Sequence, residues 1–289
     1  MTGDTDPADS HDLPGGMMNA GAVVRRGAVV ERPAPPNVRA LHAYLRALRR
    51  RGFDAAPVPV GVRADGREQL TFIPGDVAVP PFPRWAMSEA ALRSVGGLLR
   101  RLHEASAGVC VDVSAGWAGE LADPEGGTML CHNDVCLENV VFRDGRAVAL
   151  IDFDQAAPGR PVWDVALTAG YWVPMRDPES TAPLYAEPGT SHASDAPSRL
   201  RLLADGYGLS PRERAELPEV VEQAAEVCRA FVARRVAEGN PVYVQAHRDL
   251  GGWERWDRIQ AWLAARRETF RAALLEGLDT GSVRPLPPL

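Results

Sequence analysis

The first 77 residues alternate short β-type apolar runs with one helical pattern. Turn signals at Arg25-Arg26-Gly27 and Asp65-Gly66 separate the runs, as expected for two hairpins. The strand candidates are 22–24, 27–33, 59–62 and 70–73. Between the hairpins, apolar residues recur at helical spacing over 38–48, and Gly52 ends the helix. With a glycine-rich stretch at 15–19, this part predicts a small sheet with one helix.

The rest of the chain is mostly helical in pattern. Ser88 is a suitable N-cap for a helix whose apolar face includes Leu92 and Leu99. The further helical patterns cover 160–173, 198–206, 211–237 and 253–276. Residues 176–197, rich in Pro, Ser, Thr and Ala, are expected to form a loop.

A small β-containing part followed by a large helical part predicts an α+β protein with two lobes. We expect a disordered lead at 1–14, where the sequence is polar and acidic with little to bury. An N-terminal lobe is expected at 15–77 and a C-terminal lobe at 78–289, with the Pro-rich stretch near residue 80 as the passage between them.

One strand-rich segment, CHNDVCLENVVFRDGRAVALIDFD from residue 131 onward, interrupts the helical part. The strand candidates in it are 140–142 and 147–151. The RDGR sequence between them is a strong hairpin signal. Folding the chain about Asp144-Gly145 brings Asn139 and Asp152 to the same open end. Asp134 lies in the loop that leads into this hairpin, so three polar side chains are predicted to converge.

The converging groups suit phosphoryl transfer. Mg²⁺ takes one or two protein carboxylates and completes its shell with phosphate oxygens and water. A separate carboxylate can then accept the proton of an attacking hydroxyl. The alternative is that these are turn residues on an ordinary surface hairpin, because Asp and Asn often occupy turns. The order and spacing of Asp134, Asn139 and Asp152 favour a phosphoryl-transfer site over ordinary turn residues.

These strings resemble known enzymes. HNDVCLEN and IDFD resemble the catalytic loop and the metal-binding motif of protein-kinase-like enzymes. The longer string from His132 to Ala166 resembles the aminoglycoside phosphotransferase and choline kinase-like family. The resemblance implies a two-lobed protein-kinase-like fold, ATP and Mg²⁺ as cofactors, Asp134 as catalytic base, and Asn139 and Asp152 as metal ligands. The residues that it implies as supporting the site are His132, Asp154 and Asp164.

The nucleotide-binding half departs from the family pattern. Such enzymes use a strand lysine on the phosphates, held by a helix glutamate, whereas all 32 basic residues of this chain are arginine. Arg32 is the candidate replacement, and the other reading is a solvated surface arginine. The helix at 37–51 has no acid to hold it, and His42 is its nearest inward polar candidate.

Further nucleotide contacts follow from the same resemblance. Gly16 and Asn19 would belong to a glycine-rich loop over the phosphates. Backbone groups of Phe72 and Ile73 would hydrogen-bond the adenine, or else this segment is a plain buried edge strand.

The reaction that the resemblance implies transfers the γ-phosphoryl group of ATP to a hydroxyl of a small molecule. Enzymes of this kind confer antibiotic resistance by phosphorylating the antibiotic. Acidic residues in the C-terminal helices suggest a cationic or amine-bearing acceptor, and aromatic residues there line a pocket or belong to the core. These residues are Asp249, Glu254 and Asp257, and Tyr243, Trp253 and Trp256. The alternative is a non-catalytic or degraded kinase-like binding protein. The missing lysine suits this alternative, and the short N-terminal lobe also resembles trifolitoxin-immunity-type proteins.

Charge and composition exclude several classes of partner and location. A net charge of −6 and a pI near 5.6 argue against a nucleic-acid partner. No uninterrupted apolar stretch approaches 18 residues, so no membrane span is expected. The polar start of the chain is not a secretory signal, and the four cysteines form no CxxC pair. We therefore expect a cytoplasmic protein with free thiols.

Overall fold

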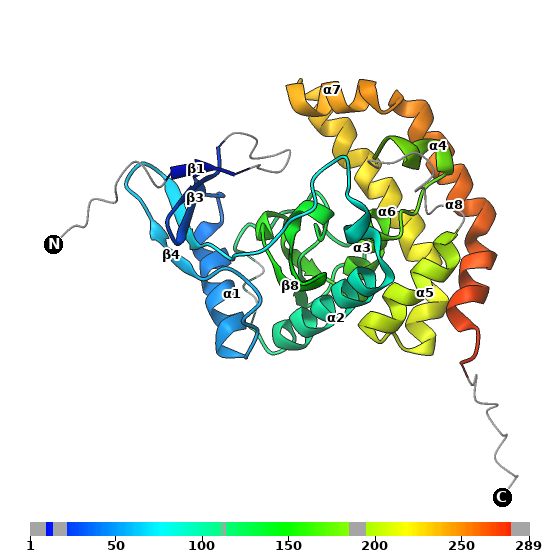
Figure 1. The fold of residues 1–289 in the computed structure, drawn as a ribbon, viewed down its shortest axis with the longest axis horizontal. Coiled ribbons are helices and arrows are strands. Elements are labelled where there is room, and N and C mark those ends of the chain that lie inside the picture. The colour runs from blue at the N-terminus through cyan, green and yellow to red at the C-terminus, as the bar shows by residue number, and fades with distance from the viewer. Residues whose placement is uncertain (1–9, 14–21, 111, 113, 185–194, 279–289) are drawn as a thin grey trace, which may run out of the picture.

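The computed structural model describes residues 10–13, 22–110, 112, 114–184 and 195–278, which form a small sheet-containing lobe beside a larger helical lobe (Figure 1). The N-terminal lobe contains β1 (Ser10–Asp12), β2 (Val24–Arg26), β3 (Val29–Pro33), α1 (Val38–Arg50), β4 (Pro59–Val62) and β5 (Arg67–Thr71). Its strands pair antiparallel in the order β1-β2-β3-β5-β4. The α+β, two-lobed fold predicted from the pattern is confirmed.

The C-terminal lobe is built from helices around two short strand pairs. Its helices are α2 (Glu89–Ser106), α3 (Pro161–Trp172), α4 (Pro178–Thr181), α5 (Ala196–Tyr207), α6 (Pro211–Ala237), α7 (Pro241–Asp249) and α8 (Gly252–Leu275). Its strand pairs are β6 (Met129–Cys131) with β9 (Ala157–Gly159), and β7 (Val140–Arg143) with β8 (Arg146–Leu150). No helix among the described residues is long and apolar enough to cross a membrane.

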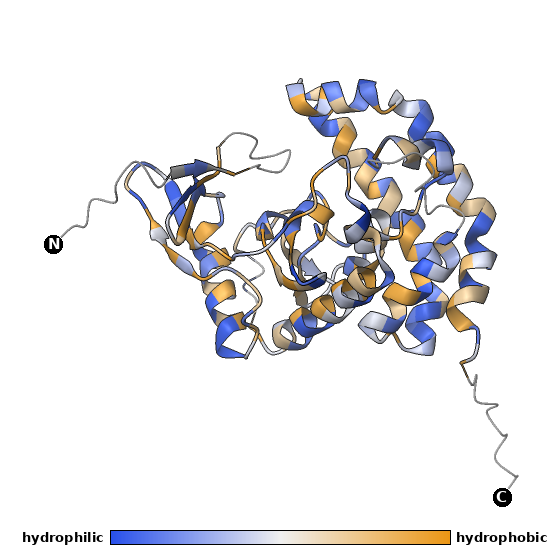
Figure 2. Cartoon of the chain, in the orientation of Figure 1, coloured by the Kyte–Doolittle hydropathy of each residue, from blue (hydrophilic) through white to orange (hydrophobic). Residues whose placement is uncertain are grey.

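The helical periodicity places one face of each main helix in a shared core. α2 starts where the Ser88 hydroxyl accepts a hydrogen bond from the Ala91 amide, and it buries Leu92 and Leu99 completely. α1 buries Leu41 and Leu48 in the same cluster. Each such leucine contributes roughly 1.5–3 kcal/mol. Figure 2 shows apolar and polar residues side by side along these helices, as this packing requires.

Four expectations need correction. Ser10–Asp12 form a strand paired with β2, so the lead expected to be disordered over 1–14 is wrong for this stretch, because backbone pairing needs no apolar side chain. The second strand of the β4–β5 hairpin is Arg67–Thr71 rather than 70–73. Pro178–Thr181, expected as loop, is α4, capped by the Asp177 carboxylate. The turn between β2 and β3 lies at Gly27-Ala28 rather than at Arg25-Arg26-Gly27, because Arg25 and Arg26 belong to β2. A further helix, Pro241–Asp249, was not predicted from the sequence.

The β7–β8 hairpin and the passage between the lobes meet closely. Asp144 and Gly145 both have positive φ, 51° and 71°, as a tight two-residue hairpin turn requires. Asp76 in the passage exchanges two backbone hydrogen bonds with Phe142, of 2.9 and 2.7 Å. Gly75, with φ of 153°, precedes it, and a Cβ there would lie 2.5 Å from the Phe142 carbonyl oxygen. Only glycine allows this approach.

A buried carboxylate fixes the loop between β6 and β7. Asp164 of α3 accepts hydrogen bonds from the backbone amides of His132 (2.6 Å) and Asn133 (2.9 Å). It also lies 3.0 Å from Nε2 of His103 on α2, whose Nδ1 is 2.7 Å from the Tyr207 hydroxyl of α5. Burial alone raises the pKa of Asp164, but the His103 and His132 hydrogen bonds outweigh it and hold that pKa below its usual value. Three helices thereby position this loop.

We predict that Asp164→Asn lowers the free energy of unfolding by about 3 kcal/mol, because an amide leaves buried donors unpaired. Urea denaturation measures the change. Since the folded pKa is lowered, the stabilisation is complete above the ordinary carboxyl pKa and is lost as pH falls through the folded value. The difference between the two proteins should therefore be constant at neutral pH and shrink below about pH 4.

The matched control is Asp54→Asn, because Asp54 pairs with Arg101 on the exposed surface. We expect a change within about 0.5 kcal/mol for this variant. Equal losses for both substitutions would contradict a positioning role for Asp164.

Candidate active site

The guanidinium group of Arg32 lies between the two lobes. It projects from β3 and donates to Asp152 Oδ1 at 2.8 Å and to both Asp154 oxygens, at 3.2 and 2.5 Å. Arg32 is 5% exposed, so the reading as a solvated surface arginine is wrong. Burial opposes its charge, but Asp152, Asp154 and Glu68 more than offset this and raise its pKa. Arg32 therefore stays charged and bridges β3 to the segment that follows β8.

The partner of Arg32 within its own lobe is a strand carboxylate. Arg32 Nε donates to Glu68 Oε1 of β5 at 2.7 Å, in the register that pairs these two residues. The other Glu68 oxygen lies 2.8 Å from His42 Nε2 of α1. The expectation that α1 carries no acid and turns His42 inward is confirmed, and the acid comes from the neighbouring strand. Glu68 shares the buried face of β5 with Leu70, which was its sequence signal.

Asp152 and Asp154 present oxygen ligands toward the gap that Arg32 spans. Both side chains are 24% exposed. Asp152 adopts a left-handed backbone conformation with φ of 60°, uncommon for a residue other than glycine and typical of functional sites. Burial and the nearby Asp152 charge raise the pKa of Asp154 to about 6, while Arg32 opposes the rise. These carboxylates and the Asn139 amide oxygen form a donor set that fits Mg²⁺.

Asp134 lies beside this group in the loop before β7. Asn139 Nδ2 donates to the Asp134 backbone oxygen at 3.0 Å and to its Oδ2 at 3.1 Å, which leaves the Asn139 amide oxygen for a cation. Burial and the Asp152 charge raise the pKa of Asp134 to about 7, although hydrogen bonds from Tyr171 and Asn139 favour the charged form. The hairpin therefore brings Asp134, Asn139 and Asp152 together as the sequence pattern predicted.

His132 and Asp164 support this loop from behind. His132 Nε2 lies 3.1 Å from the Ile151 carbonyl oxygen, and its Nδ1 lies 3.3 Å from the Asp134 amide. This pattern suits a neutral imidazole that donates from Nε2 and accepts at Nδ1. Burial lowers the pKa of His132, in agreement. His132 thus links the loop to the end of β8.

Sequence reasoning missed Tyr171. Its hydroxyl donates to Asp134 Oδ1 at 3.2 Å. Burial and the Asp134 charge raise the pKa of Tyr171 well above its usual value, so it stays a donor. Tyr171 follows Asp164 by seven residues on α3, two helical turns along the same face. That spacing was the signal available in the sequence.

The remaining nucleotide candidates are less completely placed. Gly16 and Asn19 lie outside the described residues, in the segment that connects β1 to β2. The Phe72 amide donates to the Ala28 carbonyl at 2.8 Å, so this donor is used within the sheet. The Arg25 guanidinium covers the Phe72 ring at 3.9 Å from its centroid. An adenine contact here would use the Phe72 carbonyl or the backbone of Ile73.

Several of the C-terminal acids and aromatic residues make contacts with their neighbours in the helical lobe. Asp257 pairs with Arg229 at 2.7 Å, and Asp249 accepts from Gln245 at 2.8 Å. Trp253 is 37% exposed, and its ring contacts that of His247 at a tilt, with centroids 4.1 Å apart. Tyr243 is buried in a small apolar cluster with Phe231, as the core interpretation predicted.

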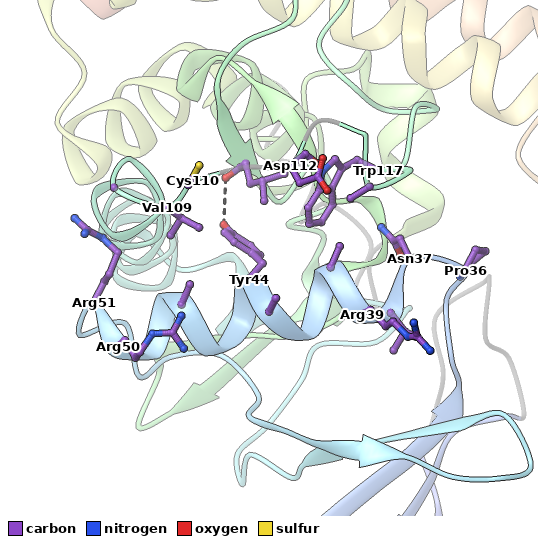
Figure 3. Close-up of a pocket in the computed structure, with 17 residues that line it drawn as sticks. Pro36, Asn37, Arg39, Tyr44, Arg50, Arg51, Val109, Cys110, Asp112 and Trp117 are labelled. Carbon is purple, nitrogen blue, oxygen red and sulfur yellow. Dashed lines mark hydrogen bonds between the residues drawn. The ribbon is translucent and has the colours of Figure 1, made fainter.

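A hollow of about 850 Å³ lies on another part of the molecule, between α1 and the segment after α2 (Figure 3). Tyr44 and Trp117 line it, in an edge-to-face contact with centroids 6.3 Å apart, and Arg39 and Arg50 also border it. Tyr44 donates to the Leu130 carbonyl at 3.2 Å. None of the carboxylates described above lines this hollow.

Comparison with known proteins identifies the family. Residues 107–203 match the family model described as "Phosphotransferase enzyme family". The chain is 33% identical over 267 residues to the trifolitoxin immunity protein of Rhizobium leguminosarum bv. trifolii, covering 87% of this chain and 94% of that protein.

Solved structures share the fold. A choline/ethanolamine kinase family protein from Mesorhizobium loti matches with a TM-score of 0.58 and 17% identity, over 87% of this chain and 88% of that one. The GDP complex of aminoglycoside 2'-phosphotransferase-IIIa matches with a TM-score of 0.56 and 13% identity, over 91% and 95% of the two chains. The chain therefore belongs to the phosphotransferase enzyme family, with the trifolitoxin immunity protein among its relatives, and it shares its fold with an aminoglycoside phosphotransferase and a choline/ethanolamine kinase family protein.

Proposed function

We propose that this protein transfers the γ-phosphoryl group of ATP to a hydroxyl group of a small molecule, with Asp134 as the catalytic base. The observation that carries the proposal is the position of Asp134, which contacts Asn139 and lies near the charge of Asp152, the carboxylate that Arg32 binds. An Asp with a pKa of about 7 is ionised in about half of the molecules at neutral pH, and it is then a stronger base than an ordinary carboxylate.

In the proposed reaction, the acceptor oxygen attacks the γ-phosphorus while its proton passes to an Asp134 carboxylate oxygen. The bond from the γ-phosphorus to the β,γ-bridging oxygen breaks, and ADP leaves with the bonding electrons. Mg²⁺, held by Asp152 and Asn139, would neutralise phosphate charge. Tyr171 orients the Asp134 carboxylate through its hydroxyl, which leaves Oδ2 to Asn139 and the acceptor.

Arg32 is proposed to bind the nucleotide phosphates in place of the family lysine. Glu68 fixes the Nε side of its guanidinium, and His42 fixes Glu68, so the two Nη groups point toward the C-terminal lobe. The planar guanidinium suits two phosphate oxygens at once. An amine-bearing acceptor stays a prediction. Asp257, one of the acids expected to attract such an amine, is paired with Arg229.

A second candidate function is a kinase-like protein that binds its ligand without turnover. The observation that favours it is that the Arg32 guanidinium already occupies Asp152 and Asp154, where a tethered cation competes with a metal ion. The identity to a trifolitoxin immunity protein is compatible with an immunity role.

Calorimetry with ATP and Mg²⁺, followed by an assay of ATP consumption with aminoalcohols, sugars and antibiotics, separates the two candidates. Acceptor-dependent ADP formation supports the transferase. Nucleotide or acceptor binding without ADP formation across the panel would support the binding protein.

We predict that Asp134→Asn lowers kcat about 10²- to 10⁴-fold, because the amide cannot accept the acceptor proton. Steady-state ADP formation measures the loss, and the melting temperature checks folding. The control is Asp144→Asn in the exposed β7–β8 turn, where asparagine tolerates the positive φ, and this variant should keep wild-type kcat. Full turnover by Asp134→Asn would rule out the base.

We predict that Glu68→Gln raises KM for ATP about tenfold with a smaller effect on kcat, because the neutral amide holds the Arg32 guanidinium less firmly. An initial-rate analysis at varied ATP measures the split. Gln69→Leu is a control on the other face of β5, where Gln69 bonds Glu31 and does not contact Arg32. If Glu68→Gln left KM unchanged, Arg32 would not need Glu68 to hold nucleotide.

A further inference from the structure

A group of buried charges lies where α4 packs against the start of α8 (Figure 1). Within the described part of the chain, four buried side-chain atoms without a hydrogen-bond partner are found here. They are Asp177 Oδ2, Ser180 Oγ, Arg255 Nε and Arg258 Nε. Buried polar atoms in folded proteins are nearly always bonded, so such a concentration indicates missing partners.

Arg255 is the buried cation of this group. It is 6% exposed, and its hydrogen bond is a long one, from Nη2 to the Ser180 carbonyl at 3.5 Å. Glu179 lies 3.2 Å from Arg258, and Asp177 Oδ1 caps α4 by accepting a hydrogen bond from the Ser180 amide at 3.0 Å. Burial and the nearby Arg176 and Arg258 lower the pKa of Arg255 to about 10, although the Asp177 charge opposes part of this shift.

The position of Arg255 on α8 adds to this cost. It lies in the first turn of a 24-residue helix that no side chain caps, where the helix dipole disfavours a positive charge. A buried cation at such a place is expected to have an anionic partner.

The group adjoins the acceptor side of Asp134. Arg176 lies five residues beyond Tyr171, and its guanidinium donates to the Gly170 carbonyl at 2.6 Å. Cys228 of α6 lies within electrostatic range of both ends: burial and the Asp134 charge raise its thiol pKa, and Arg176 lowers it. The Arg176 charge also lowers the pKa of Arg255. The chain thus runs from Tyr171, which contacts Asp134, through Arg176 to Ser180, whose carbonyl oxygen Arg255 contacts.

We propose that Ser180, Arg255 and Arg258 form a subsite for an anionic group, a carboxylate or a phosphate, on the acceptor molecule. The guanidinium Nε and Nη atoms of Arg255 supply a two-pronged donor, and the Ser180 hydroxyl supplies a third. The subsite rests on the proposed function for its role in acceptor binding, but its occupation by an anion does not require turnover.

The test measures the melting temperature in sodium phosphate, sodium acetate and sodium chloride at equal ionic strength. We expect a rise of about 2 °C or more at 50 mM phosphate or acetate relative to chloride. The anion that raises the melting temperature more shows whether the subsite prefers a phosphate or a carboxylate. Arg255→Gln should abolish the rise, and Arg266→Gln, an exposed arginine on the same helix, should keep it.

A second variant separates a binding role from a structural one. Arg255→Met removes a buried charge that its surroundings compensate only in part, and it should raise the melting temperature in chloride by a few degrees. A large fall, or failure to fold, would show that internal contacts hold Arg255 and would overturn the subsite.

Two further outcomes also overturn it. Equal melting temperatures in all three salts would mean that ordered water satisfies these atoms. An anion effect that survives Arg255→Gln but is lost in Arg32→Gln would locate the anion beside Arg32. Failure of the proposed function is read separately, as unchanged ATP consumption by Asp134→Asn.

Discussion

The arrangement of the two lobes depends on one buried cation. Arg32 is the point where β3, β5, α1 and the segment after β8 meet, because it contacts Glu68, Asp152 and Asp154 at once. Without it, three carboxylates would face one another in a partly dehydrated space, where like charges repel strongly. A lysine presents a single ammonium and could not reach all three with comparable geometry. The absence of lysine is therefore matched by a different network.

That network differs from the one in the C-terminal lobe. Asp164 is fully buried and bonded to backbone amides and to His103, so it holds the loop of Asp134 in one conformation. Arg32 instead holds side chains that are partly exposed and that a metal ion would also bind. One part of the site is fixed by the fold, and the other depends on which cation occupies the carboxylates. This contrast explains why the same geometry supports both a transferase and a binding protein.

The hairpin half of the site could be predicted because its geometry is local. A two-residue turn at Asp144-Gly145 sets the register, and the register brings Asn139 and Asp152 to one end. Helix boundaries followed for the same reason, from caps and apolar spacing. The partner of Arg32 could not be found this way, since Glu68 lies 36 residues along the chain and faces it only after β3 and β5 pair.

The sequence by itself determined the fold class, the main helices and the position of Asp134, because each follows from short-range periodicity, turn chemistry and motif spacing. Tertiary structure alone decided that Glu68 and His42 hold Arg32, that Tyr171 contacts Asp134, and that Arg255 is buried beside α4. Those contacts join elements distant in the chain. Their energies arise from burial and charge pairing, which exist only once the lobes have packed.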